Sequence, residues 1–246
     1  MKSENKKVVI SVILFLFVLL NASAQNETPA EYKKIMLGLS FSPDYCSRVL
    51  KSKPSYNSFV EERNDTEIPK FGFTTGLNLL MRLDRKLDLE SGIFYSNKGY
   101  KTQKQNLFWL DNNKDVPVNY QVIYTYQYFD IPLKLNYYFI TSRIRFFLTS
   151  GISLNIFNRQ QIKLKLEEAN GNRSSSLSQN DLGFSSVNLE LLTGVGMFYT
   201  LSDRMHLKVQ PIYRTSLTSL TSSTMINEKL YSIGVDIGFY FTFKKK

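Results

Sequence analysis

Residues 231–243, YSIGVDIGFYFTF, alternate between two kinds of side chain. The odd-numbered positions are large and apolar or aromatic, whereas the even-numbered positions from Ser232 to Gly238 are small or polar, with Asp236 among them. A period of two residues is typical of a β-strand whose two faces meet different surroundings. This stretch therefore predicts a strand with one apolar face and one small, polar face.

The same period recurs along the chain and predicts eight strands. They lie near residues 34–42, 70–83, 87–96, 121–139, 144–157, 185–200, 205–214 and 230–243. In all eight strands, charged residues lie only on the face opposite the large apolar side chains, and strand glycines such as Gly196 and Gly238 share that polar face. The ten charged residues are Arg82, Asp88, Glu90, Asp130, Lys134, Arg145, Glu190, Lys208, Arg214 and Asp236.

The distribution of side chains over the two faces distinguishes between kinds of barrel. A soluble barrel needs an apolar interior and a polar exterior. Here the small residues and charges suit a narrow interior, so the large apolar side chains must point outward into lipid. A bilayer also requires the sheet to close, because an open edge would leave backbone groups unpaired in hydrocarbon. The sequence predicts an all-β, eight-stranded antiparallel up-and-down transmembrane β-barrel.

The connections between the predicted strands alternate in length. Short turns at residues 84–86, 141–143 and 201–204 alternate with long polar segments, as in outer-membrane barrels, where short turns face the periplasm and long loops face outside. The long segments lie near residues 43–69, 97–120, 158–184 and 215–229.

The first residues of the chain predict export. Lys2, Lys6 and Lys7 precede an apolar run from Val8 to Leu20, and residues 22–24 (Ala-Ser-Ala) supply the small side chains of a signal-peptidase site. We therefore expect a cleaved signal peptide at 1–24 and location in the cell outer membrane. A short periplasmic segment (25–33), the barrel (34–243) and a basic tail (244–246) follow it.

Composition and motifs argue against several other classes of protein. The net charge is +10, but no basic helix or zinc module accompanies it, so we expect no nucleic-acid partner. Cys46 is the only cysteine, which excludes an internal disulfide. His206 is the only histidine and lacks the partners that a metal site or a His-based hydrolase needs. We therefore predict no catalytic residue, metal ligand or cofactor, and no enzyme.

One stretch resembles a known family. Residues 128–139, YFDIPLKLNYYF, resemble the central strand of the PorT-like outer-membrane β-barrel family, and Gly194 to Gly196 and the Gly234/Gly238 strand fit the same pattern. The resemblance covers about residues 33–243. It implies a barrel, and the branch that gives the family its name is associated with a protein secretion system.

The ten inward charges form the candidate site. Unpaired charges are costly in a lumen that holds little water, so we expect them to pair. Counting residues outward from each short turn predicts which charged residues lie opposite each other on neighbouring strands. Paired in this way, the charges would form a polar plug with a structural role. The alternative is a path for protons or ions. The predicted pairs are Arg82–Asp88, Glu90–Lys134, Glu190–Arg214 and Lys208–Asp236.

The third long segment carries a further strand pattern. Ile162, Leu164 and Leu166 continue the even-numbered apolar positions of the strand before them, and Asn170-Gly171 is a favoured type I′ hairpin turn. This predicts a β-ribbon above the outer leaflet that could add a partner's strand. The alternative is a disordered loop, because residues 173–181 are rich in serine.

These observations predict a non-enzymatic outer-membrane barrel with a structural, adhesion or secretion-accessory role through its extracellular loops. The alternatives are a small passive channel and, third, a loop-borne outer-membrane enzyme. The expected partners are outer-membrane lipid, the barrel-assembly machinery during biogenesis and a protein at the extracellular loops.

Overall fold

The computed structural model describes residues 35–109, 116–141, 143–179, 183–221 and 226–242. The predicted signal peptide, the segment 25–33 and the tail 244–246 lie outside these residues. All eight predicted strands are present as long strands. They are β1 (Ile35–Ser52), β2 (Glu67–Asp84), β3 (Leu87–Thr102), β5 (Pro117–Thr141), β6 (Ile144–Glu168), β8 (Val187–Thr200), β9 (Met205–Ser216) and β10 (Ile226–Thr242).

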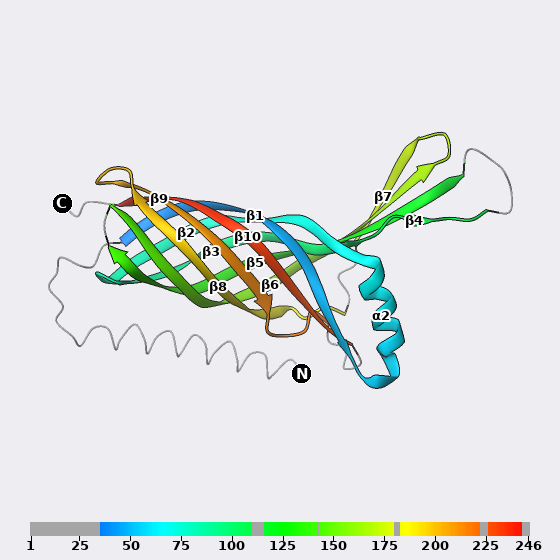
Figure 1. Ribbon diagram of the computed structural model, residues 1–246, viewed down its shortest axis with the longest axis horizontal. Coiled ribbons are helices and arrows are strands. Elements are labelled where there is room, and N and C mark those ends of the chain that lie inside the picture. Colours follow the sequence, from blue (N-terminus) through cyan, green and yellow to red (C-terminus); the bar gives the residue numbers. More distant parts are fainter. Residues whose placement is uncertain (1–34, 110–115, 142, 180–182, 222–225, 243–246) are drawn as a thin grey trace.

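The eight long strands form one closed antiparallel ring. Their order is β5-β3-β2-β1-β10-β9-β8-β6, and a further pairing of β5 with β6 closes the ring (Figure 1). Two short strands lie outside it, since β4 (Gln105–Asn106) pairs with β5 and β7 (Arg173–Gln179) pairs with β6. The predicted eight-stranded up-and-down barrel is confirmed.

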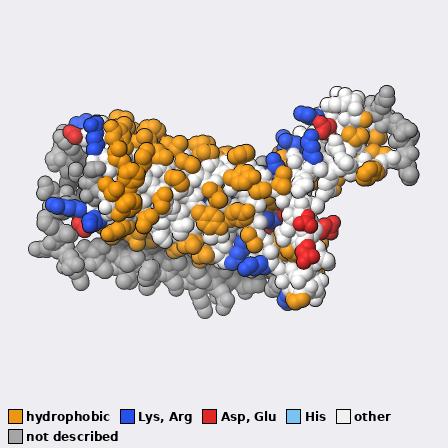
Figure 2. Space-filling view, in the orientation of Figure 1, with side chains coloured by type: hydrophobic (Ala, Val, Ile, Leu, Met, Phe, Trp, Pro, Cys, Tyr) orange, Lys and Arg blue, Asp and Glu red, His pale blue; other side chains and the backbone are white. Residues whose placement is uncertain are grey.

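The two faces of the wall carry the side chains that the alternation predicts. In β1, exposed and buried residues alternate from Ile35 to Tyr45, and the exposed ones are large and apolar. Leu148 on β6 and Phe239 on β10 are likewise about half exposed on the outside. In the space-filling view, hydrophobic atoms cover much of the visible wall (Figure 2). The charged and small residues lie inside, which confirms the predicted direction of the two faces.

Glycines make room inside the barrel for large rings. A Cβ atom at Gly196 would lie 2.5 Å from Cζ of Phe147, and one at Gly38 would lie 2.8 Å from Cδ1 of Tyr240. Both distances are too short for real contacts. The two glycines therefore let aromatic rings from other strands fill a narrow lumen, as an eight-stranded barrel requires.

The first long connection holds helical structure. A 3₁₀ turn, η1 (Pro54–Tyr56), leads into the helix α2 (Asn57–Thr66). Lys53 and Pro54 begin this segment, and the following residues include Val60, whose side chain is buried against the neighbouring strands. No helix in the described part of the chain is long and apolar enough to cross a membrane.

Several strands run well beyond the predicted ends. β1 continues to Ser52 and β3 to Thr102, while β6 runs on to Glu168 beside the first part of β5. Beyond the ring, β4, β5, β6 and β7 form a sheet that stands clear of the barrel at one end (Figure 1). We call this four-stranded part the extracellular sheet. The predicted ribbon, rather than a disordered loop, is therefore confirmed.

Two details of the predicted ribbon are wrong. A β-bulge at Asn158 shifts the register, because Tyr128 pairs with Phe157 while Gln127 pairs with Arg159. One extra residue reverses the two faces of a strand. The even-numbered side chains from Ile162 onward therefore continue the lumen side of the wall, not its lipid side.

The hairpin turn also differs from the predicted type. A type I′ turn needs a positive φ at both central residues, but only Gly171 has one, at +88°, and Asn170 does not. Gly171 N donates to Glu168 O, and Glu168 N donates to Asn172 O. This is a three-residue connection in which glycine occupies the left-handed position of a bulge.

Candidate functional site: the barrel lumen and the extracellular sheet

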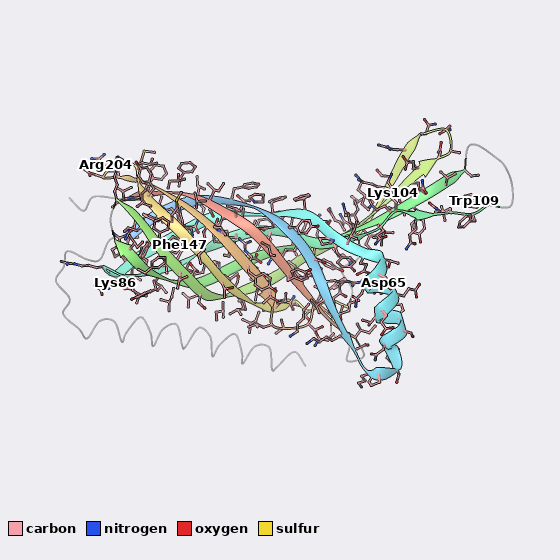
Figure 3. All side chains as sticks on the ribbon, in the orientation of Figure 1. Asp65, Lys86, Lys104, Trp109, Phe147 and Arg204 are labelled. Atoms are coloured by element: carbon pink, nitrogen blue, oxygen red, sulfur yellow. The ribbon has the colours of Figure 1, made fainter. Side chains whose placement is uncertain are left out.

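Aromatic and apolar side chains close the lumen at the end with the short turns. Phe147, Tyr138 and Tyr240 are fully buried there, and Phe147 lies within the barrel near the end marked by Lys86 and Arg204 (Figure 3). The guanidinium carbon of Arg145 lies 4.2 Å from the ring centre of Tyr138, so this predicted charge rests on an aromatic surface. Six residues form the layer: Met36, Leu80, Tyr138, Phe147, Phe198 and Tyr240.

The middle of the lumen centres on Glu90. Its carboxylate lies 2.6 Å from Nζ of Lys134 and 2.7 Å from Nζ of Lys208. Asn136 Nδ2 and the Tyr240 hydroxyl also donate to it, at 2.8 and 3.0 Å. Lys208 in turn lies 3.2 Å from Asp236. Every lone-pair direction of the buried carboxylate therefore has a partner, which is the condition under which buried charges are tolerated.

A second group of charges lies on the side of Glu90 toward the long loops. Lys98 Nζ lies 2.8 Å from Glu190 and 3.4 Å from Asp130. Arg214 Nη1 lies 2.7 Å from Asp44, which also accepts hydrogen bonds from the hydroxyls of Ser42 and Thr74. A cavity of only about 20 Å³ remains between these residues. A space of this size holds about one water molecule.

The structure brings together three of the four predicted pairs. Arg82–Asp88 is present at 3.1 Å, beside the Glu90–Lys134 and Lys208–Asp236 contacts. The predicted pair Glu190–Arg214 is wrong, since Glu190 binds Lys98 and Arg214 binds Asp44. The predicted strands ended at residues 42 and 96. Asp44 and Lys98 follow Ser42 and Ser96 by two positions, so extending the alternation by one step would have placed both in the lumen.

A further charge cluster closes the mouth toward the long loops. Arg48 forms hydrogen-bonded ion pairs with Glu67 and, at 2.6 Å, with Glu228. Its guanidinium lies 3.8 Å from the ring centre of Tyr100. Burial opposes the charge of Arg48, but the two carboxylates outweigh it and raise its pKa. Burial also raises the pKa of the Tyr126 phenol below it, so that ring stays neutral.

The two faces of the extracellular sheet differ in character. Tyr120, Val122 and Tyr124 of β5 pair with Leu166, Leu164 and Ile162 of β6, and together they form an apolar inner face. The outer face carries the intervening residues, among them Lys163 and Lys165, which are exposed. In Figure 3, Lys104 and Trp109 lie on this sheet, far from the barrel end that holds Lys86.

The sequence of the chain matches a family model. The model described as outer membrane protein beta-barrel domain covers residues 23–222. The chain belongs to this family. This outer-membrane protein therefore sits in the cell outer membrane, with its short turns in the periplasm and its long loops outside. This match establishes the outer-membrane barrel family but does not assign the chain to its PorT-like branch.

Several solved structures are similar to this chain at low sequence identity. Neisserial surface protein A is 15% identical, with a TM-score of 0.39 over 85% of this chain and 97% of its own. OprG from Pseudomonas aeruginosa is 14% identical, with a TM-score of 0.38 over 87% and 97%. The outer membrane protease OmpT from Escherichia coli is 8% identical, with a TM-score of 0.42 over 90% and 100%. No curated protein matches the sequence.

His206 and Cys46, the other two residues considered for chemistry, are packed among side chains of this outer-membrane barrel. His206 is half-buried near the periplasmic end, where its Nε2 lies 3.0 Å from the Thr242 hydroxyl and its ring stacks on Phe198. Cys46 is fully buried. Across the described residues, no three His, Cys, Asp or Glu side chains gather as they would around a metal ion.

Proposed function

We propose that this protein is a non-enzymatic, non-conducting outer-membrane barrel that presents its extracellular sheet to a protein partner. The lumen supports the non-conducting part of the proposal. An aromatic layer lies at the periplasmic end, the Glu90 charge network fills the middle and the Arg48 cluster closes the outer mouth. A passive channel needs a continuous aqueous path, so a filled lumen favours a role outside the barrel.

The observation that carries the proposal is the open edge of β7. Within the described residues β7 pairs only with β6, and all seven of its residues are exposed. It contains no proline, and its one charged residue is Arg173 at the start of the strand. Edge strands are usually protected from further pairing by prolines, bulges or charges. An unprotected edge outside the membrane suits strand addition by an extended segment of a partner.

The hairpin geometry indicates which backbone groups of β7 face the open edge. Glu168 and Asn172 are joined through a backbone hydrogen bond at the turn. In an antiparallel pair, hydrogen-bonded positions alternate along the strand. Ser174 and Ser176 therefore direct their N–H groups toward β6, whereas Ser175 and Leu177 direct theirs toward the open edge. Leu177, which is 60% exposed, adds an apolar contact for a partner.

Two roles fit such a partner, adhesion and assistance to secretion. The resemblance of residues 128–139 to the PorT-like family supports a partner within a protein secretion system. Adhesion to a protein outside the cell uses the same edge.

A photoreactive amino acid at Leu177 tests the proposal in the full chain in its native membrane. We expect one discrete cross-linked adduct. Ser175→Pro removes a donor at the open edge and should abolish the adduct while the β6–β7 pairing survives. The matched control is Leu217, an exposed leucine on another extracellular segment, where the same probe should give no adduct. An adduct that persists in the Ser175→Pro variant, or no adduct at Leu177, would contradict strand addition at β7.

A further inference from the structure

The outer face of the extracellular sheet continues the lipid-facing side of the barrel wall. On β5, Phe129 and Ile131 are exposed to lipid, and counting back by two from Phe129 reaches Thr125, Ile123 and Gln121 without a bulge on this strand. Ile123 and Gln121 pair with Lys163 and Lys165 of β6. These lysines therefore lie on the side of the sheet that looks over the membrane around the barrel, not over its mouth.

This outer face is strongly basic. We call it the basic face, and it consists of six cationic residues and one acid. Lys101 pairs with Ile123, Arg159 pairs with Gln127, and Arg173 pairs with Glu167. The strand register therefore places Lys101, Arg159 and Arg173 on the basic face. Figure 2 shows blue side chains gathered where the sheet leaves the barrel. The members are Lys101, Lys104, Arg159, Lys163, Lys165, Arg173 and Glu167.

A groove on this face has two cations without an acidic partner. It measures about 290 Å³, and its lining includes Lys163, Lys165 and Gln121. Glu167 also lines it but lies 2.8 Å from Lys104 and 3.1 Å from Arg173, which together offset its charge. The hydrogen bonds from these two residues hold the pKa of Glu167 below its usual range. Among the described residues, no carboxylate lies within 4.0 Å of Lys163 or Lys165.

The height of the cations above the bilayer indicates the class of ligand. Ile156 is the last lipid-facing residue of β6, and Arg159 follows about 10 Å further along the strand. With a strand tilt of about 45°, Lys165 stands roughly 20 Å above Ile156. Phospholipid headgroups extend only about 5–8 Å beyond the hydrocarbon. Arg159 therefore reaches the headgroups of any lipid, but Lys163 and Lys165 reach only a lipid with a large headgroup.

We propose that the basic face binds the phosphate and carboxylate groups of outer-leaflet glycolipids, of which lipopolysaccharide is the general example. Arg159 meets anionic groups at the membrane surface, and the groove with Lys163 and Lys165 meets acidic sugars or phosphates above it. The amide of Gln121 supplies a hydrogen bond to the sugar. The proposed ligand is thus a lipid of the surrounding outer leaflet, bound on the outer side of β5 and β6.

The experiment measures binding of rough lipopolysaccharide with a complete core oligosaccharide, presented in mixed detergent micelles, to the immobilised full-length protein. We expect the double variant Lys163→Gln/Lys165→Gln to bind about fivefold more weakly or worse, since two exposed ionic contacts are lost. The matched control, Lys51→Gln/Lys53→Gln, removes two exposed lysines elsewhere and should bind like the wild type. Micelles with phosphatidylglycerol in place of the glycolipid should show no difference between the two double variants.

A second pair of variants works in the opposite direction. Glu167→Gln frees Lys104 and Arg173 and should strengthen glycolipid binding, whereas Glu168→Gln makes the same change of charge on the inner face and should not. Heat-modifiable migration on gels shows that each variant is folded. Equal weakening by both lysine pairs would overturn the proposal, because net charge alone would explain it.

Soluble dextran sulfate separates the glycolipid from a free polyanion. If it binds the groove more tightly than the glycolipid does, and the Lys163/Lys165 variant loses only that binding, the ligand is a soluble polyanion and the proposal is wrong. Failure here leaves strand addition intact. Leu177 pairs with Lys163 on the same face, but Ser175→Pro tests the backbone pairing of the β7 edge, whereas the lysine variants change only side chains.

Discussion

Lys208 Nζ lies 2.7 Å from Glu90 Oε1, although the two residues are 118 positions apart and stand on opposite walls of the barrel. Lys208 belongs to β9 and Glu90 to β3, and three strands separate them in either the order β2-β1-β10 or β5-β6-β8. The contact therefore crosses the whole lumen. Together with Lys134 on β5, it ties two other strands to the Glu90 carboxylate of β3.

Removing the charge of Glu90 should destabilise the barrel strongly. In Glu90→Gln, Lys134 and Lys208 remain buried while their shared carboxylate is lost, and only Asp236 is left to balance Lys208. Breaking a buried ionic group in this way costs about 3–5 kcal/mol of unfolding free energy. Urea unfolding followed by heat-modifiable gel migration measures it. Glu167→Gln, the same change at a surface pair, should leave the unfolding free energy close to that of the wild type. Similar losses in both variants would show that Glu90 is not the centre of the network.

The lipid-facing assignment predicts opposite results for two exposed leucines. Leu148 is 51% exposed on the barrel wall, and Leu177 is 60% exposed on β7 above the membrane. Leu148→Arg places a charge in hydrocarbon and should cost about 2–4 kcal/mol, whereas Leu177→Arg meets water and should cost close to nothing. The unfolding free energy in lipid vesicles decides it. Two equal values would refute the position of the membrane on the wall.

The filled lumen predicts that the protein does not conduct. We expect no discrete current steps when the purified protein is inserted into a planar bilayer in 1 M KCl, because aromatic and ionic layers occupy the path from Phe147 to Arg48. Insertion is checked on the same sample by heat-modifiable migration after reconstitution. Steady steps that grow in proportion to the salt concentration would establish the channel alternative instead.

The burial of Lys70 predicts that the unfolding free energy of the protein rises in alkaline solution. The Lys70 ammonium lies beside Thr125, which is four residues beyond the lipid-facing Phe129 toward the loops. Among the described residues it bonds neutral groups, Asn97 Oδ1 and Thr125 Oγ1, each at 2.8 Å. Burial lowers its pKa from 10.5 to about 8. Between these values the unfolded chain binds more protons than the folded one, so the unfolding free energy increases as pH rises from about 8 to 10.5.

Lys70→Met should remove this dependence. At pH 7 the variant should be more stable than the wild type by about 2–3 kcal/mol, and the difference should shrink to nothing above pH 10.5. Lys53→Met, which replaces an exposed lysine, should leave the urea midpoint unchanged at both pH values. An unfolding free energy of Lys70→Met that runs parallel to that of the wild type from pH 7 to pH 11 would show that Lys70 carries no burial penalty.

The alternation in stretches such as residues 231–243 was enough to predict a membrane barrel from the sequence alone. Whether a side chain lies on one face of a strand or the other depends only on its parity, which is local information. Glycines and charges on one face and large apolar residues on the other then indicated which face meets lipid. The ion pairs next to short turns, such as Arg82–Asp88, followed from counting, because a tight turn sets the register of the two strands it joins.

Only the tertiary structure decided the features that depend on more than one strand pair. The bulge at Asn158 reverses the faces of β6, yet no local signal distinguishes it from regular strand, and it determines that Lys163 looks over the membrane. The Glu90–Lys208 contact depends on which walls oppose each other after the ring closes, and that follows from the combined stagger of all eight strands. Which face of a strand a residue occupies is local information that the sequence contains, whereas the contacts across the lumen depend on how the whole ring closes.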